Sequence, residues 1–424
     1  MNNGDKYIKR AQTISQGVVD ICIQDGTIVE ISDAEAESEP HVADDDLIDA
    51  AGKLVTPTLI EPHTHLDLAG TGHYSPDDHS GTLGESLSVT ADLEGERTVE
   101  EIERSAAKTV KELISNGITK IRTHTYVSQH GKKSLSALRS IKQTFSDVAD
   151  IQIVAFPVES VVRDERALDR VQEAVDRGVD LIGGIPHAEP TREMGVKQIE
   201  ILLNIANKHD LPVDMHIDET DDPKSRYTEV LVAKARALGI GDRTTASHVT
   251  AMHSYPNDYA SQLAHMLSES NITVVTNPLT NAVLQGRQDD YPRRRGHTRI
   301  DELRDAGVDV GIAQDDIRSV FYRYGDCDLL TAAFVLCHYA HMDRRSDVED
   351  IWEMLLEGNK RVFMTEEHGL KEGADGSVVV YQEKSPFEVL RERSPRDTVL
   401  RNGRVIAEGS SSRRVHVTDT WHSI

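Results

Sequence analysis

Residues 54–68 read LVTPTLIEPHTHLDL, an apolar run punctuated by two prolines that ends in two histidines separated by one residue. In a β-strand, side chains at positions i and i+2 project to the same face, so His63 and His65 can reach one metal ion together. A strand that ends in such a pair favours a metal site. The H-x-H pattern alone is equally compatible with two packed or surface histidines, so the rest of the chain must decide.

Short runs rich in β-branched residues alternate with longer segments of helical periodicity through most of the chain. This alternation predicts an α/β fold, a (β/α)8 TIM-type barrel, whose active site lies at the C-terminal ends of the strands. The runs are 56–65, 118–125, 151–157, 180–187, 211–218, 244–250, 272–278 and 308–316. Helices are expected at 98–116, 165–177, 193–209 and 225–239.

The two ends of the chain predict a smaller second domain. Each end holds a segment that alternates apolar and polar positions around a tight turn, which is typical of a β-hairpin. The hairpins are 17–32, around Asp25-Gly26, and 398–409, around Asn402-Gly403, with a further strand at 376–382. We expect both ends to join one small β-sandwich, and the acidic segment 38–46 to be a solvated loop. The expected domains are 1–55 (N-terminal part of the sandwich), 56–370 (barrel) and 371–424 (C-terminal part of the sandwich).

The charge of the chain restricts its partners. With 72 acidic and 47 basic residues, the formal net charge is −25. This excess repels nucleic-acid phosphates and anionic membrane surfaces, so we expect a small-molecule substrate and neither nucleic acid nor membrane as partner. The same acidity suits a protein that stays soluble in high salt, and we hypothesise a halophilic cytoplasm.

Cysteine usage and apolar content point to a reducing compartment. Cys22, Cys327 and Cys337 show no C-x-x-C spacing, so neither a disulfide framework nor a thiolate zinc site is indicated. The N-terminus has no apolar signal-peptide region, and no apolar run reaches the roughly 18 residues of a membrane span. A cytoplasmic location is expected.

Titratable residues end four of the predicted strands. They are His63 and His65 on the first strand, His216 with Glu219 on the fifth, His248 on the sixth, and Asp315 with Asp316 on the eighth. Each one alone has an ordinary explanation, such as a packed histidine or a helix N-cap. Together, two histidines, a third histidine and a carboxylate form a ligand set suited to Zn2+ or Fe2+, with a position open for water. A metal in such a set activates water near neutral pH, so the pattern predicts a hydrolase.

Several longer motifs occur between and around these residues. They are EPHTHLD (61–67), SGTL (80–83), VAFP (154–157), IPHAEPTRE (185–193), HIDETDD (216–222), TASHVTAMHSY (245–255), LQGR (284–287), YPRRRG (291–296) and DD (315–316). In this order they resemble the amidohydrolase superfamily, and within it the bacterial cytosine deaminases, over most of the chain.

The resemblance implies a role for each strand-end residue. His63, His65, His216 and Asp315 match the ligands of a single iron or zinc ion. Glu219 matches the glutamate that shuttles protons to the ring nitrogen and the departing ammonia, and His248 matches the histidine that holds or polarises the attacking water. Asp315 can also accept the proton of that water.

The resemblance also bears on metal count and assembly. Residues 180–187 contain no lysine, so the carboxylated-lysine bridge of two-metal relatives is absent. The expected cofactor is therefore one divalent ion, Fe2+ or Zn2+. Barrel deaminases of this family are commonly oligomeric, so the resemblance allows a homo-oligomer.

Three positions depart from the cytosine deaminase pattern. Val158 replaces a glutamine expected to read the polar edge of the pyrimidine, Gln314 replaces a histidine, and Phe321 replaces a tryptophan expected to wall the pocket. A lost hydrogen-bonding group changes substrate choice more than a lost apolar contact does. The expected substrate-binding residues are Val158, Gln285, Asp316, Phe321 and Leu83.

The first functional interpretation is hydrolytic deamination of cytosine to uracil and ammonia. An alternative keeps the chemistry and changes the ring to isocytosine, an aminated triazine or a pterin, which the three departures favour. A third interpretation is a non-catalytic scaffold with an amidohydrolase barrel, which would be expected to have lost metal ligands. The small zinc cytidine deaminases are excluded, because their P-C-x-x-C motif does not occur here.

Overall fold

The computed structural model describes residues 5–34, 43, 46–76 and 79–410, together with the backbone of 414–417 and 420–423. The chain forms two compact units. Unit 1 comprises Met1–Thr58, Ile114–Ile118 and Glu367–Ile424, and unit 2 comprises Leu59–Leu113 and Thr119–Glu366. Of the acidic segment 38–46, only residues 43 and 46 lie within the described part of the chain.

Unit 2 is built on an eight-stranded sheet in which the strands follow one another in sequence order, β6 to β13. From β7 to β13, each strand pairs in parallel with the next. The strands are β6 (Leu59–Thr64), β7 (Ile118–Tyr126), β8 (Asp150–Phe156), β9 (Leu181–Ile182), β10 (Val213–Ile217), β11 (Thr244–His248), β12 (Thr273–Thr276) and β13 (Val310–Ile312). Each overlaps one of the eight predicted runs.

The sheet closes between its first and last strands. A parallel bridge joins Thr64 to Asp315. The Asp315 amide donates to the carbonyl of His63 over 3.0 Å, and the Thr64 hydroxyl donates to the carbonyl of Asp315 over 2.6 Å. The predicted (β/α)8 barrel is therefore confirmed, and its closing seam contains two residues predicted to bind metal.

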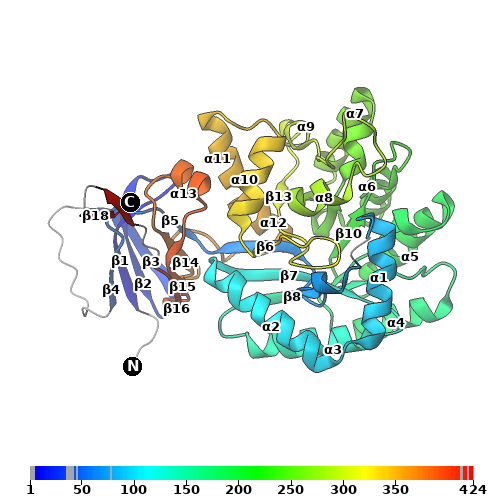
Figure 1. The fold of residues 1–424 in the computed structure, drawn as a ribbon, viewed down its shortest axis with the longest axis horizontal. Coiled ribbons are helices and arrows are strands. Elements are labelled where there is room, and N and C mark those ends of the chain that lie inside the picture. Colours follow the sequence, from blue (N-terminus) through cyan, green and yellow to red (C-terminus); the bar gives the residue numbers. More distant parts are fainter. Residues whose placement is uncertain are drawn as a thin grey trace. The chain divides into compact units, whose positions relative to one another are not determined.

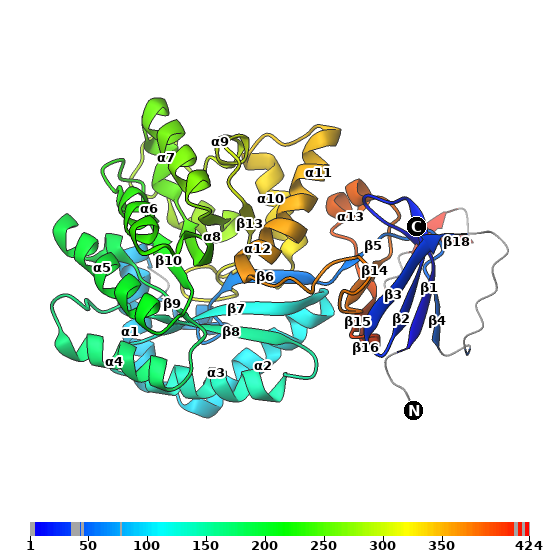
Figure 2. The same ribbon diagram turned by 180° about the vertical axis from the view of Figure 1, so that it is seen from behind.

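Helices lie on the outside of the strands of this unit (Figures 1 and 2). They are α1 (Leu83–Glu96), α2 (Val99–Ser115), α3 (Lys132–Thr144), α4 (Glu165–Asp176), α5 (Arg192–Lys208), α6 (Tyr227–Leu238), α7 (Asn257–Glu269), α8 (Pro278–Leu284), α9 (Ile300–Asp305), α10 (Leu329–Tyr339), α11 (Arg345–Glu353) and α12 (Asn359–Phe363). The four helices predicted from periodicity correspond to α2, α4, α5 and α6. In α4, Ala167, Val171 and Ala174 recur at helical spacing and are buried, which explains why the pattern was readable.

The first barrel strand begins later than predicted. Residues Val55–Pro57 form a separate strand, β5, which pairs antiparallel with β14 (Val378–Tyr381) in unit 1. β5 is an edge strand, where proline is tolerated because one side of the strand needs no amide donor. Pro57 therefore ends the strand of one unit just before Leu59 begins the barrel.

Unit 1 contains two four-stranded sheets that share a hydrophobic core, so the small β-sandwich is confirmed. Ile21 and Ile23 from one sheet and Val380 and Leu400 from the other belong to one buried cluster. One sheet holds β1 (Lys6–Gln12), β2 (Val18–Gln24), β3 (Thr27–Asp33) and β4 (Leu47–Asp49); the other holds β5, β14, β15 (Arg396–Arg401) and β16 (Arg404–Glu408). The unit also contains α13 (Pro386–Glu392) and the pair β17 (Arg414–Val417) and β18 (Thr420–Ser423).

Both predicted hairpin turns have the backbone that their sequences require. Asp25 and Gly26 have φ of 48° and 79°, and Asn402 and Gly403 have φ of 48° and 70°. Two successive residues with positive φ match the twist of the flanking strands, and Asn-Gly and Asp-Gly adopt this conformation most readily. The turn chemistry therefore fixes the register of both hairpins.

The described residues also include no helix long and apolar enough to cross a membrane. The three cysteines are free thiols, as their spacing predicted.

Candidate active site

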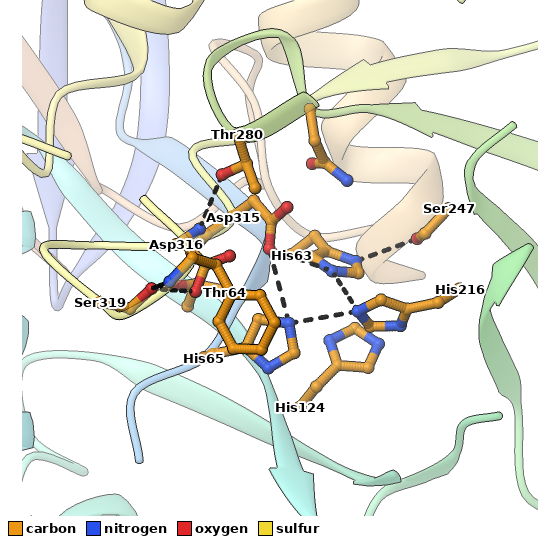
Figure 3. A network of polar contacts seen from close by, with 12 residues as sticks. His63, Thr64, His65, His124, His216, Ser247, Thr280, Asp315, Asp316 and Ser319 are labelled. Carbon is orange, nitrogen blue, oxygen red and sulfur yellow. Dashed lines mark hydrogen bonds and ion pairs between the residues drawn. The ribbon is translucent and has the colours of Figure 1, made fainter. Parts of the chain in front are cut away.

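Four predicted metal ligands meet at the C-terminal ends of the barrel strands (Figure 3). His63 lies in β6, His65 follows that strand by one residue, His216 lies in β10 and Asp315 follows β13. The Nε2 atom of His216 lies 3.2 Å from Nε2 of His63 and 3.1 Å from Nε2 of His65. Asp315 Oδ1 lies 3.6 Å from Nε2 of His63 and 3.5 Å from Nε2 of His65.

The chemistry of these four side chains fits a divalent metal ion. Burial lowers the pKa of His63, His65 and His216 well below the ordinary value, so the three imidazoles are neutral and can offer lone pairs. The Oδ1 atom of Asp315 is buried and has no hydrogen-bond partner within the described chain. Three converging imidazole nitrogens and an unpartnered carboxylate oxygen form the nitrogen-rich set preferred by Zn2+ and Fe2+.

Two residues of the site have backbones in the left-handed region. His248 has φ of 74° and Asp315 has φ of 67°, although neither is glycine. Such conformations cost about 1–3 kcal/mol each and persist where the surrounding structure enforces them. At Asp315 the seam hydrogen bonds to β6 supply that enforcement and aim its carboxylate at the histidines.

Glu219 and His248 form the second part of the site. His248 Nδ1 lies 3.5 Å from Glu219 Oε1 and 4.0 Å from Asp315 Oδ2, so the histidine stands between the two carboxyl groups. The side-chain amide of Asn281 donates to Glu219 Oε1 over 2.9 Å, and its Oδ1 lies 3.2 Å from His248 Nδ1. The side chains of Glu219, His248 and Asn281 are all buried.

Burial sets opposite protonation tendencies for these two groups. Burial, and then the nearby Asp316 carboxyl, raise the pKa of Glu219 to about 8. Burial lowers the pKa of His248 to about 3. At neutral pH, Glu219 can therefore donate a proton while His248 remains a neutral imidazole, which is the division of roles that general acid catalysis needs.

A small pocket opens beside these groups. Its walls combine apolar side chains with the polar groups of the site: His65, Leu83, Leu87, Tyr126, Phe156, Ile185, His216, Glu219, His248, Leu284, Asp315, Asp316 and Phe321.

Three of the five expected substrate-binding residues line this pocket, namely Leu83, Asp316 and Phe321. Asp316 is held by the Ser319 hydroxyl, which donates to its Oδ1 over 2.6 Å, while burial raises its pKa to about 7. Val158 packs against the same apolar cluster as Leu83.

Two glutamines singled out in the sequence, one an expected substrate-binding residue and one a departure from the deaminase pattern, do not line the pocket. Gln285 is buried but does not line the pocket, and its Nε2 has no hydrogen-bond partner among the described residues. Gln314, one of the departures, uses its side-chain amide to donate to Asp326 Oδ1 over 3.1 Å and to the carbonyl of Asp328 over 2.6 Å. Gln314 thus holds the segment before α10 and does not face the pocket.

Sequence reasoning missed four polar residues beside the site. His124 (β7), Asp214 (β10), Ser247 (β11) and Asn281 (α8) are all buried next to metal-ligand or proton-transfer candidates. The strand-end rule could have found His124, because it lies next to the last residue of the predicted run ITKIRTHT. In the structure, its Nε2 lies 3.6 Å from Asp214 Oδ1. Asp214 precedes His216 by two residues and shares its face of β10. Ser247 and Asn281 carry no comparable signal.

Comparison with known proteins gives consistent matches over nearly the whole chain. Residues 80–407 match the model of the amidohydrolase family. The crystal structure of 5-methylcytosine deaminase from Klebsiella pneumoniae liganded with 5-fluorocytosine is 35% identical. The two structures superpose over 96% of this chain and 98% of the Klebsiella chain, with a TM-score of 0.91.

Two curated relatives are more distant in sequence. N-isopropylammelide isopropyl amidohydrolase from Pseudomonas sp. strain ADP is 27% identical, covering 92% of this chain and 94% of that protein. Pterin deaminase from Rhizobium rhizogenes is 26% identical, covering 92% of this chain and 89% of that protein. The enzymatic interpretation is confirmed over the scaffold, and the buried histidine and carboxylate centre lies in a chain that belongs to the amidohydrolase family, among its metal-dependent hydrolytic deaminases.

Proposed function

We propose that the protein removes the exocyclic amine of a cytosine ring, acting on cytosine and its 5-methyl derivative. The observation that carries the proposal is a buried Glu219, whose pKa is raised to about 8, lining one pocket together with His65, His216 and Asp315 of the candidate metal centre. The likeness to 5-methylcytosine deaminase, at 35% identity, supports the same ring.

The residues divide the reaction between them. His63, His65, His216 and Asp315 would hold one Zn2+ or Fe2+ ion, which supplies Lewis-acid activation of the attacking water. The water oxygen bonds to ring carbon C4, and the bond from C4 to the amine nitrogen breaks to release ammonia.

Protons are balanced by Asp315 and Glu219. Asp315 accepts one proton of the water, and Glu219 gives its own proton to ring nitrogen N3. The second water proton reaches the departing amine, and the proton held by Asp315 then restores Glu219. His248 lies between the two carboxyl groups, where it can orient the water and pass a proton across.

Substrate identity is tested by ammonia release from metal-reconstituted protein at high and at low salt. The panel holds cytosine, 5-methylcytosine, isocytosine, an aminotriazine and a pterin. We expect the two cytosines to give the highest kcat/KM, because the chain is 35% identical to a 5-methylcytosine deaminase and only 27% and 26% identical to the ammelide and pterin enzymes. A higher kcat/KM for isocytosine or the triazine would overturn the choice of ring and leave the metal and proton-transfer roles intact. Higher activity in high salt would support the halophilic hypothesis.

Val158 gives a second test of ring recognition. We expect Val158→Gln to raise kcat/KM for cytosine by up to about tenfold, the value of one added neutral hydrogen bond. The reason is that Val158 packs against the same apolar cluster as the pocket-lining Leu83, so a longer polar side chain there could reach the polar edge of the ring. Val158→Leu, which adds volume and no polar group, is the matched control. If both variants keep the relative kcat/KM values of the unmodified protein for the substrates of the panel, groups other than residue 158 hold the ring.

A further inference from the structure

A fully buried hydrogen-bonded chain runs behind one metal ligand. Arg122 Nη1 donates to Asp214 Oδ2 over 2.9 Å, and the Ser247 hydroxyl donates to Asp214 Oδ1 over 2.6 Å. The same Ser247 oxygen lies 3.0 Å from Nδ1 of His63, a contact drawn in Figure 3. All four side chains have no exposed surface.

The protons of this chain can be counted. The Arg122 guanidinium is always protonated, and a carboxylate paired with it only accepts hydrogen bonds. The single hydroxyl proton of Ser247 is therefore committed to Asp214. Ser247 can then only accept from His63, so the proton of the neutral His63 ring must sit on Nδ1.

This assignment matters because of the other ring nitrogen. With the proton on Nδ1, Nε2 of His63 carries the lone pair, and Nε2 is the atom that faces His216 and Asp315. The opposite tautomer would direct an N–H bond into the centre and remove one ligand. The hydrogen bond to Ser247 thus selects the metal-binding form.

His63 is distinct among the three histidine ligands in this respect. Within the described residues, the Nδ1 atoms of His65 and His216 have no hydrogen-bond partner. Of the three rings, only that of His63 has its tautomer set by the surrounding protein. The first ligand of the site is therefore organised in advance of metal binding.

The far end of the chain is anchored by further contacts of Arg122. Its Nε donates to Gln152 Oε1 over 2.9 Å, and its Nη2 donates to the carbonyl of Val362. Asp214 is consequently held between a fixed guanidinium and the Ser247 hydroxyl. Such partners of metal-binding histidines fix ring orientation, and their loss typically weakens metal binding by about 10- to 100-fold.

We propose that Ser247 and Asp214 are positioning residues that hold His63 in the Nδ1-protonated form and thereby set the metal affinity of the site, with Arg122 as their anchor. The proposal rests on the metal centre of the proposed function and does not depend on which ring is the substrate.

The test is competition for Zn2+ between the holoprotein and a chromogenic chelator. We expect Ser247→Ala to raise the dissociation constant for Zn2+ by about 10- to 100-fold. Ser247→Thr keeps the hydroxyl and should retain more of the affinity than the alanine variant. Asp214→Asn should weaken binding as well, although an unpaired Arg122 can also impair folding, so the serine variants carry the test.

Thr244→Val is the matched control. Thr244 is a buried hydroxyl on the same strand, and it donates to the carbonyl of Ile240 over 2.7 Å, away from the metal ligands. Unchanged Zn2+ affinity in Ser247→Ala, or an equal loss in Thr244→Val, would overturn the proposal. If the unmodified protein binds no Zn2+ at all, the metal centre of the proposed function fails together with this inference. If no ring of the substrate panel is deaminated, the proposed activity fails, but the inference about Ser247 and Asp214 does not.

Discussion

Glu219→Gln is expected to lower kcat by at least about 10²- to 10⁴-fold, the range typical of acid/base catalysis, while the protein keeps its fold and its metal. Glutamine has nearly the same shape as glutamic acid and can still accept the hydrogen bond from Asn281. It has no transferable proton, so it cannot protonate the ring nitrogen. Because this interaction forms in the transition state, kcat and kcat/KM should fall together while KM changes little.

Three quantities are measured for each variant: the steady-state rate of ammonia release, the metal content and the thermal unfolding temperature. Glu189→Gln provides the control, because Glu189 is also a buried carboxylate of the barrel unit. It accepts hydrogen bonds from Ser160 over 2.6 Å and from Gln198 over 2.8 Å and does not line the pocket. Near-normal turnover in Glu219→Gln would remove Glu219 from the mechanism.

Removal of the metal with a chelator is expected to lower activity by at least about 10²-fold, since a Lewis acid contributes several kcal/mol to such a reaction. Addition of Zn2+ or Fe2+ should restore it. We expect about one equivalent of metal per chain at full activity, because the four proposed ligands converge on one point and residues 180–187 contain no lysine that could bridge two metals. Metal analysis by mass spectrometry during titration gives the stoichiometry.

The same titration should change stability. An ion that binds only the folded chain stabilises it by about 4 kcal/mol when its concentration is a thousandfold above the dissociation constant. The melting temperature should therefore rise on metal addition and fall on chelation. Activity that survives complete removal of the metal, or a second equivalent needed for turnover, would contradict the one-metal centre.

The barrel and the convergence of its strand-end side chains could be predicted because they follow short-range rules. Each strand is a compact apolar run, and strand ends gather at one face of the barrel, so His63, His216 and Asp315 could be brought together without coordinates. The hairpin turns at Asp25-Gly26 and Asn402-Gly403 were readable for the same reason, since backbone conformation at a turn is a local property.

Other features depend on contacts that sequence patterns do not encode. Helix α1 (Leu83–Glu96) was not predicted, and only four of its residues are buried, which leaves a weak apolar stripe. Ser247 and Asn281 are small polar residues whose roles come from neighbours on other strands and helices. The change of partner after Pro57 was also missed, because an apolar strand of one unit runs directly into that of the next.

The closing seam of the barrel has a consequence for folding. Thr64 and Asp315 pair across 251 positions of sequence, and Asp315 is also a proposed metal ligand. A nascent chain that has made the first seven strands holds the histidines but not the carboxylate. Contacts between residues so distant in sequence form late in folding, because the entropy cost of closing the long loop comes before the contact can stabilise the fold. Tight metal binding should therefore occur late in folding. A bound ion would then hold the first strand of the barrel to the last.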